Sequence, residues 1–178
     1  ILLIDAGQIW VEDVERAAAR MPALAEAGTT WLEEPFEASA YEAYKALSLR
    51  VRLLRNRARA LAQLNQFKLA NDALIEAQRV AESVVDPKLR AELHLEAARL
   101  ARSGGDRPEV QRNVEQVLVL AQELRNSQLA GHAQEVLGLA AQDAGDRKLA
   151  ERELQASYRA FASLGLVRDE LRLTRALL

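Results

Sequence analysis

The chain has 178 residues, a formal net charge of −2 and no cysteine, and it is 49% hydrophobic and 28% charged but only 4% aromatic. The lack of cysteine excludes disulfides and thiolate metal sites, and no run reaches the ~20 apolar residues of a membrane-spanning helix. A near-neutral charge and few aromatic residues argue against nucleic-acid binding, and the cysteine-free composition is compatible with a cytoplasmic location.

The first 48 residues differ in charge from the rest of the chain. Residues 1–48 carry nine acidic and three basic residues, whereas residues 49–178 carry 17 acidic and 21 basic residues. Such asymmetry indicates two segments with different origins. We therefore predict domains at 1–48 and 49–178, joined near residues 46–50. No Pro-, Gly- or Ser-rich linker separates them, so one helix can run across the joint.

The sequence pattern of the front segment is that of alternating strands and helices. A short apolar run, ILLID, precedes an amphipathic stretch over residues 11–27, a second extended run, TTWLEEP, and a helix over residues 39–47. This order predicts a βαβα unit with two parallel strands. Two parallel strands alone leave both outer edges unpaired, so the unit looks like part of a larger sheet.

Three stretches of this segment resemble the third and fourth strand–helix units of the enolase-superfamily barrel, in its mandelate racemase and sugar-acid dehydratase branch. They read LLIDAGQIW, WLEEPF and AYKAL. In that family the Asp closing the first motif and the first Glu of the EEP motif bind Mg²⁺, which corresponds here to Asp5 and Glu33. The resemblance implies carboxylate oxygens suited to Mg²⁺ and a metal that stabilises an enediolate.

The rest of the chain departs from that family. Where the family has a third carboxylate, this sequence reads RNRARALAQ. The catalytic lysines, the general base and the capping domain are also missing, and the resemblance covers two of eight barrel units. We therefore expect no catalytic residues and no cofactor. Asp5 and Glu33 are vestigial metal ligands, and Mg²⁺ enters only if the barrel interpretation holds.

Residues 49–178 contain an internal repeat with a spacing of 40 residues. The segments LRVRLLRNRARALAQLNQ, LRAELHLEAARLARSGGD and LAGHAQEVLGLAAQDAGD start at Leu49, Leu89 and Leu129, and a fourth copy starts at Asp169. Each of the three ends in a polar or glycine turn near residues 65, 105 and 145, where glycine accepts a positive φ and Asp can cap the next helix. The pattern predicts helix pairs over residues 49–88, 89–128 and 129–168 and a half pair over 169–178.

This layout resembles the tetratricopeptide-repeat (TPR) family. Small residues fall where that family packs its two helices closely. They are Ala58, Ala98 and Gly138 in the first helices and Ala70 and Ala150 in the second. A period of 40 exceeds the usual 34, so each repeat should be about one and a half helical turns longer. The expected fold class is mainly α: a TPR-like superhelix of helix pairs, preceded by a βαβα fragment resembling part of a TIM barrel.

Five arginines are the candidate partner-binding residues. Arg52, Arg55 and Arg59 share one helix face by their three- and four-residue spacing, and Arg99 and Arg102 lie on the matching helix of the next repeat. In the TPR family the first helix of each pair lines a concave groove, and guanidinium groups bind carboxylates through two hydrogen bonds. An acidic peptide or a C-terminal carboxylate fits this pattern. The alternative is a solvated face neutralised by acids of the front segment.

The sequence thus favours a protein–protein interaction module over an enzyme. One alternative is a truncated, Mg²⁺-dependent acid-sugar dehydratase of the enolase superfamily, and another is a structural chimera with no ligand of its own. The expected partner is a protein or peptide, with neither nucleic acid nor membrane. The open ends of the repeat array or the unpaired strands can also support self-association.

Overall fold

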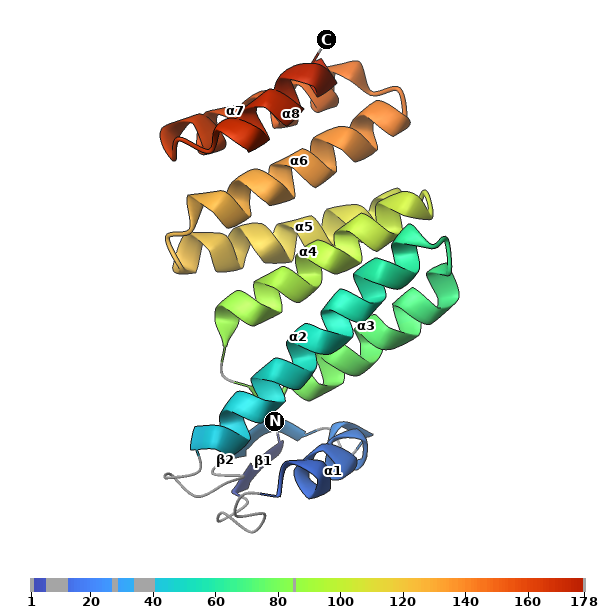
Figure 1. Cartoon of the computed structure of the whole chain (residues 1–178), viewed down its shortest axis with the longest axis vertical. Coiled ribbons are helices and arrows are strands. Elements are labelled where there is room, and N and C mark those ends of the chain that lie inside the picture. The colour runs from blue at the N-terminus through green and yellow to red at the C-terminus, as the bar shows by residue number, and fades with distance from the viewer. Residues whose placement is uncertain (1, 6–12, 27–28, 34–40, 85, 178) are drawn as a thin grey trace. The chain divides into compact units, whose positions relative to one another are not determined.

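The computed structural model describes residues 2–5, 13–26, 29–33, 41–84 and 86–177 (Figure 1). Eight helices and two short strands lie in these ranges, so the architecture is mainly α. The chain divides into two compact units, Ile1–Leu89 and Arg90–Leu178, which are described separately. Within each unit, helices that follow one another in the sequence pack together, as expected for a helical repeat.

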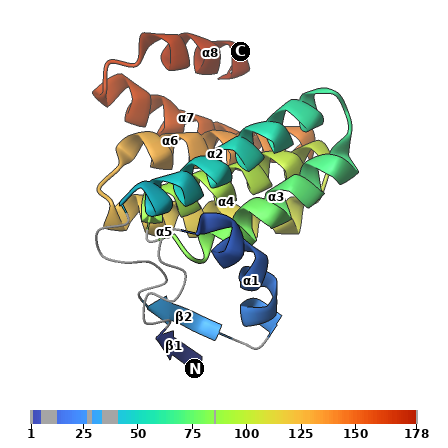
Figure 2. The same ribbon diagram turned by 60° about the horizontal axis from the view of Figure 1, so that its bottom comes forward.

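The first unit opens with two short parallel strands, β1 (Leu2–Asp5) and β2 (Thr29–Glu33). Helix α1 (Val14–Glu26) lies between them in the sequence. Figure 2 shows the two strands side by side. Asp5 is the register partner of Glu33. Within the described ranges the sheet has these two strands and no third. The parts of the barrel-like motifs at residues 6–12 and 34–40 lie outside the described residues.

Helix α2 (Tyr41–Gln63) is continuous through the predicted joint between the two segments. The helices expected over residues 39–47 and from Leu49 onward are therefore a single helix, as the absence of a linker allowed. Leu47 and Val51, on either side of the joint, are both buried, at 1% and 0% exposure. Their spacing of four residues puts them on the same helix face, so one apolar face runs across the joint.

Helix α1 packs against both α2 and the next helix, α3 (Phe67–Ala81). Its side chains Ala17 and Met21 are buried, and the Ser83 hydroxyl donates a hydrogen bond to the Met21 sulfur. Apolar burial therefore attaches this part of the front segment to the first helix pair.

The remaining helices are α4 (Pro87–Ser103), α5 (Arg107–Glu123), α6 (Ser127–Asp143), α7 (Arg147–Ser163) and α8 (Val167–Leu177). First helices of successive pairs start at residues 87, 127 and 167, and second helices start at residues 67, 107 and 147. Both series advance by 40 residues. The predicted period and the turns expected near residues 65, 105 and 145 are confirmed.

The turns repeat their backbone conformation with the same period. Asn65, Gly105 and Gly145 all have positive φ, at 59°, 73° and 76°. This left-handed conformation ends the first helix of each pair, and glycine adopts it without a Cβ clash. Asparagine is the side chain that tolerates this region best after glycine, so Asn65 serves the same role in the first pair.

Aspartate side chains cap the N-termini of the second helices that follow two of these turns. The carboxylates of Asp106 and Asp146 accept hydrogen bonds from the backbone N–H groups of Glu109 and Leu149, at 3.0 and 3.1 Å. The hydrogen bond from the Leu149 N–H, reinforced by one from the Arg107 side chain, lowers the pKa of Asp146. Gln66 stands at the corresponding position of α3 and makes no such cap.

Small side chains lie where the helices meet, as predicted. Ala58 and Ala98 are buried, at 2% and 0% exposure, and Gly138 is buried as well. A Cβ atom at Gly138 would lie 2.8 Å from Leu154 Cγ and 3.1 Å from the Leu154 backbone nitrogen. Glycine therefore lets α6 approach α7 more closely than any other residue would.

We predict that Gly138→Ala destabilises the protein, although alanine is the better helix former. The added methyl group would push against the backbone of α7, and overpacking a helix contact costs roughly 1–3 kcal/mol. The matched control is Gly104→Ala, whose Cβ would meet its nearest atom at 3.6 Å, an ordinary contact. The free energy of unfolding in urea should fall for Gly138→Ala and hold or rise for Gly104→Ala. Equal effects of the two substitutions would contradict the close-approach argument.

Candidate partner-binding surface

The five predicted arginines lie on two first helices in two different units. Arg52, Arg55 and Arg59 belong to α2 in the first unit, and Arg99 and Arg102 belong to α4 in the second. All five stand on first helices, the elements that the TPR resemblance assigns to a groove.

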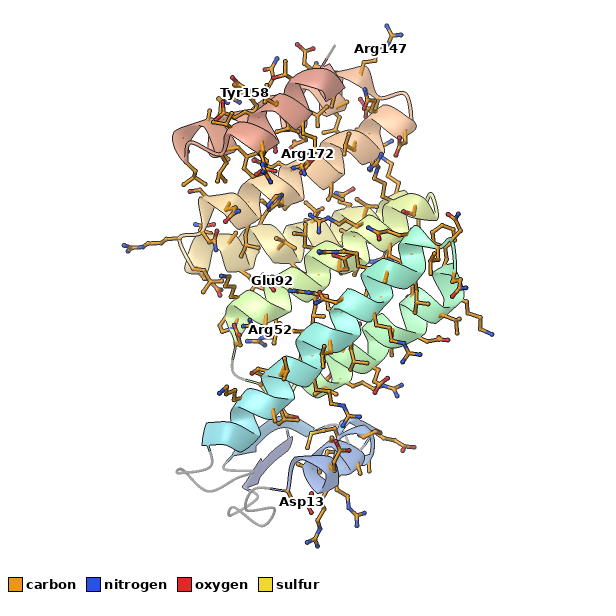
Figure 3. The ribbon with its side chains drawn as sticks, in the orientation of Figure 1. Asp13, Arg52, Glu92, Arg147, Tyr158 and Arg172 are labelled. Atoms are coloured by element: carbon orange, nitrogen blue, oxygen red, sulfur yellow. The ribbon has the colours of Figure 1, made fainter. Side chains whose placement is uncertain are left out.

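In the first unit, the arginines of α2 already contact acidic residues. Arg52 is labelled in Figure 3, its side chain is 56% exposed, and its guanidinium lies 3.9 Å from the Asp86 carboxylate. Arg50, which the sequence pattern did not single out, lies 3.4 Å from Glu15 and 3.5 Å from Glu76. An acid of the front segment therefore reaches α2, as the solvated-face alternative supposed, but it contacts a different arginine.

In the second unit, Arg102 joins two consecutive first helices. Its Nε atom donates to Asp143 Oδ2 at 2.7 Å, and Nη2 reaches Oδ1 at 3.4 Å, so α4 contacts the end of α6 through two hydrogen bonds. Arg99 donates to Glu96 on its own helix at 3.2 Å. Neither Asp143 nor Glu96 was predicted from the sequence. Asp143 lies one period plus one residue beyond Arg102, which is the signal that could have indicated the contact.

A second charged bridge joins α6 to α8. Arg172, labelled in Figure 3, donates to Glu135 at 2.8 Å and also lies 2.8 Å from Asp169 on its own helix. Glu135 is only 7% exposed. His132 Nδ1 lies 3.5 Å from the same carboxylate, and the His132 ring lies 4.9 Å from the Phe161 ring. Charged pairs thus connect each first helix of this unit to the next.

The exposure of these pairs decides what they can do. The side chains of Arg102 and Asp143 are 34% and 55% exposed, and pairs of this kind contribute about 0–1 kcal/mol to stability. A guanidinium has five N–H donors, and the Asp143 contact uses two of them. A carboxylate from another molecule could therefore join or replace Asp143 at low cost.

Asp5 and Glu33, the vestigial metal ligands, stand at the ends of the two strands as register partners. The region where a third carboxylate was sought is the arginine-rich middle of α2. Among the side chains that the structure describes, no group of three His, Asp or Glu residues could hold a metal ion.

The sequence matches no protein-family model and no curated protein. The TPR and enolase resemblances therefore remain hypotheses that depend on motifs. None of the helices within the described ranges has the length and apolar character needed to cross a bilayer.

We predict that Arg172 and Glu135 are energetically coupled. Arg172→Met leaves the poorly exposed Glu135 carboxylate without its closest cation and should cost about 1–2 kcal/mol, because a buried charge that loses its partner is destabilising. Glu135→Gln should reduce that cost when combined with Arg172→Met. Urea unfolding of both single variants and the double variant gives the coupling energy. Strict additivity would show that the bridge contributes nothing to holding α8 on α6.

Proposed function

We propose that this chain is a protein-interaction module, a TPR-like array whose first helices bind an acidic segment of a partner protein. The observation that carries the proposal is the contact between Arg102 and Asp143. This two-hydrogen-bond contact, at a side chain 34% exposed, shows how a carboxylate sits on a first helix. The Asp143 carboxylate occupies the place that a partner's Asp, Glu or C-terminal carboxylate would take.

The repeat supports this proposal because it presents arginines without using them for the core. The helix pairs are held together by small and apolar residues, of which Ala98, Val110 and Val117 are fully buried. The arginines of α2 and α4 are not part of that core, and the side chains of Arg52, Arg99 and Arg102 are 56%, 35% and 34% exposed. Guanidinium groups that are partly exposed in this way can be reached by a partner's carboxylates.

The small free energy of a partly exposed ion pair predicts a weak, salt-sensitive interaction at any one arginine. A partner carboxylate must displace or share the internal one, so the net gain from one exchange is small. Useful affinity requires several carboxylates on one segment. Because the pairs are partly exposed, salt should weaken the binding.

We predict that removing the internal carboxylate strengthens binding of an acidic peptide. A fluorescein-labelled peptide of alternating Glu and Gly, titrated at low salt and followed by anisotropy, should bind Asp143→Asn roughly two- to fivefold more tightly than the wild type, the range of a surface pair. Arg102→Gln should weaken binding by a similar factor. The control is Arg112→Gln, which makes the same charge change on second helix α5, where Arg112 pairs with Glu109.

Two outcomes would contradict this assignment. If the peptide binds Arg112→Gln as weakly as Arg102→Gln, general electrostatic attraction explains the binding and the first helices have no special part. If Asp143→Asn leaves the affinity unchanged, Asp143 does not occupy the carboxylate position.

A second candidate, the truncated acid-sugar dehydratase, is favoured by one observation. Asp5 and Glu33 are register partners at the ends of parallel strands, and barrel active sites lie at the carboxyl ends of strands. Two carboxylates without a third ligand or a general base should bind Mg²⁺ weakly and catalyse nothing. This reading therefore ranks below the interaction module.

We predict that isothermal titration with Mg²⁺ detects no Asp5-dependent site tighter than millimolar. Wild type and Asp5→Asn should give the same heats, because Mg²⁺ holds its water shell unless several carboxylates replace it. A tighter site that Asp5→Asn abolishes would favour the dehydratase over the interaction module. If this site and acidic-peptide binding are both absent, the remaining alternative is a structural chimera with no ligand of its own.

A further inference from the structure

We propose that the exposed face of α2 around Leu49 and Leu53 is a docking surface for an acidic amphipathic helix of a partner protein. This inference rests on the proposed interaction function and specifies the partner's chemistry and the face that receives it. It depends on the repeat register, on what buries the same positions elsewhere in the chain, and on the charge of α2.

Leu49 and Leu53 are exposed, at 56% and 60%. They lie four residues apart on α2, so their side chains share one face of the helix. Single exposed leucines are ordinary on protein surfaces and need no explanation. The position of these two within the repeat is what distinguishes them.

The Leu53 position is buried in every other first helix, and the Leu49 position is buried in α4 and α6. Counting forward by 40 residues, Leu53 corresponds to Leu93, Ala133 and Leu173, which are 2%, 0% and 1% exposed. Leu49 corresponds to Leu89 and Leu129, which are 1% and 6% exposed, and to Asp169 of α8, which is half-buried. The architecture therefore buries these positions against a neighbour, and α2 leaves them uncovered.

The second unit shows what that neighbour is. Leu129 and Ala133 of α6 belong to one apolar cluster with Val110, Val114 and Val117 of α5, the helix that precedes α6. Leu173 of α8 clusters in the same way with Leu154 and Phe161 of α7, the helix that precedes α8. The two positions thus form the face on which a first helix receives the second helix of the preceding pair.

In the first unit, α2 has no preceding helix pair in the described part of the chain. Helix α1 packs on α2 and α3 and buries its own Ala17 and Met21. Leu49 and Leu53 stay exposed with α1 in place. A helix from another protein can therefore take the position that α5 holds on α6.

Helix α5 also defines the apolar face that such a partner needs. Its buried residues Val110, Val114, Val117 and Ala121 follow one another at steps of four, three and four. Small and β-branched side chains at this spacing let two helices approach closely. The partner should therefore carry Ala or Val at these steps, opposite the two leucines.

The charge of α2 predicts which residues lie beside the apolar stripe of the partner helix. The segment YEAYKALSLRVRLLRNRARALAQ contains six basic residues and one acidic residue. Glu15, Glu76 and Asp86 lie beside Arg50 and Arg52 and balance part of this charge, and the helix itself stays basic. Carboxylates beside the partner's apolar stripe would complement this charge. Symmetric docking of two copies through α2 would instead bring like charges together, which argues for a different, acidic partner.

Leu64 provides a matched control within the same helix pair. It is 68% exposed, at the end of α2, but its repeat equivalents Gly104 and Ala144 are exposed as well. Exposure at Leu64 is therefore what the repeat always gives at that position. A Leu→Ser change there removes the same apolar surface without touching the proposed docking face.

The experiment uses the full chain and a labelled peptide with the α5 sequence, residues 107–123, in which Arg107 and Arg112 are changed to Glu. A peptide of the same composition in scrambled order controls for charge. Fluorescence anisotropy should show that the ordered peptide binds the wild type and the scrambled peptide binds much more weakly. Leu53→Ser should weaken binding about tenfold, the scale of one buried leucine, and Leu64→Ser should leave it unchanged. Both variants should unfold at the wild-type temperature.

The possible failures are distinguishable. If the two peptides bind equally, or Leu53→Ser has no effect, this docking face is wrong while acidic-segment binding stands. If neither the α5-derived peptide nor the Glu–Gly peptide binds, the docking face and the proposed interaction function are both wrong. If Leu53→Ser instead changes the sedimentation of the protein alone, the face joins copies of this chain and the heterologous partner is excluded.

Discussion

The structure depends on the close approach of the two helices in each pair. At Gly138 there is no room for a Cβ beside Leu154, and at Gly131 a Cβ would lie 2.9 Å from the Phe161 ring. The Ser157 hydroxyl donates to the Gly131 carbonyl oxygen at 2.8 Å and fixes the same contact. One period earlier, the equivalents of Gly131 and Phe161 are Ala91 and Ala121, both buried in one cluster. The large ring of α7 thus meets the smallest residue of α6, whereas the earlier pair places two small residues at the same positions.

Much of this architecture could be predicted from the sequence because it is local. The turn residues near 65, 105 and 145 and the small residues Ala58, Ala98 and Gly138 all showed the period of 40. The bridges from Arg102 to Asp143 and from Arg172 to Glu135 could not be predicted in the same way. They join side chains on different helices, and which side chains meet depends on how the helices cross. The arginines were therefore found without the carboxylates that restrain them.

Leu53 shows a second limit of sequence periodicity. Its apolar character repeats at Leu93, Ala133 and Leu173, so the pattern alone predicts a core residue in every repeat. Burial depends on the neighbour as well as on the residue. Ala133 and Leu173 lie in apolar clusters with the helices that precede them, α5 and α7, whereas in the described part of the chain no second helix of a preceding pair covers Leu53. A repeat array buries its apolar faces through adjacent repeats, and its ends differ from its interior for that reason alone. An apolar residue that is exposed in one repeat and buried in the others therefore indicates an uncovered helix face, which an isolated exposed apolar residue does not.

The internal carboxylates limit what a single anion can gain at the arginines of the second unit. The second unit, Arg90–Leu178, carries thirteen basic and thirteen acidic residues, so it has no net charge to attract polyanions over long distances. Asp143 and Glu96 hold Arg102 and Arg99 at short range. A single stray anion gains little by displacing them, because each exchange replaces one carboxylate contact with another. Under the proposed function, a partner segment gains only by adding contacts that the internal acids do not make, such as further carboxylates at the Arg102 N–H groups that Asp143 does not use. On this view the arginines of the second unit select the charge of the partner, and its affinity comes from several such contacts made together.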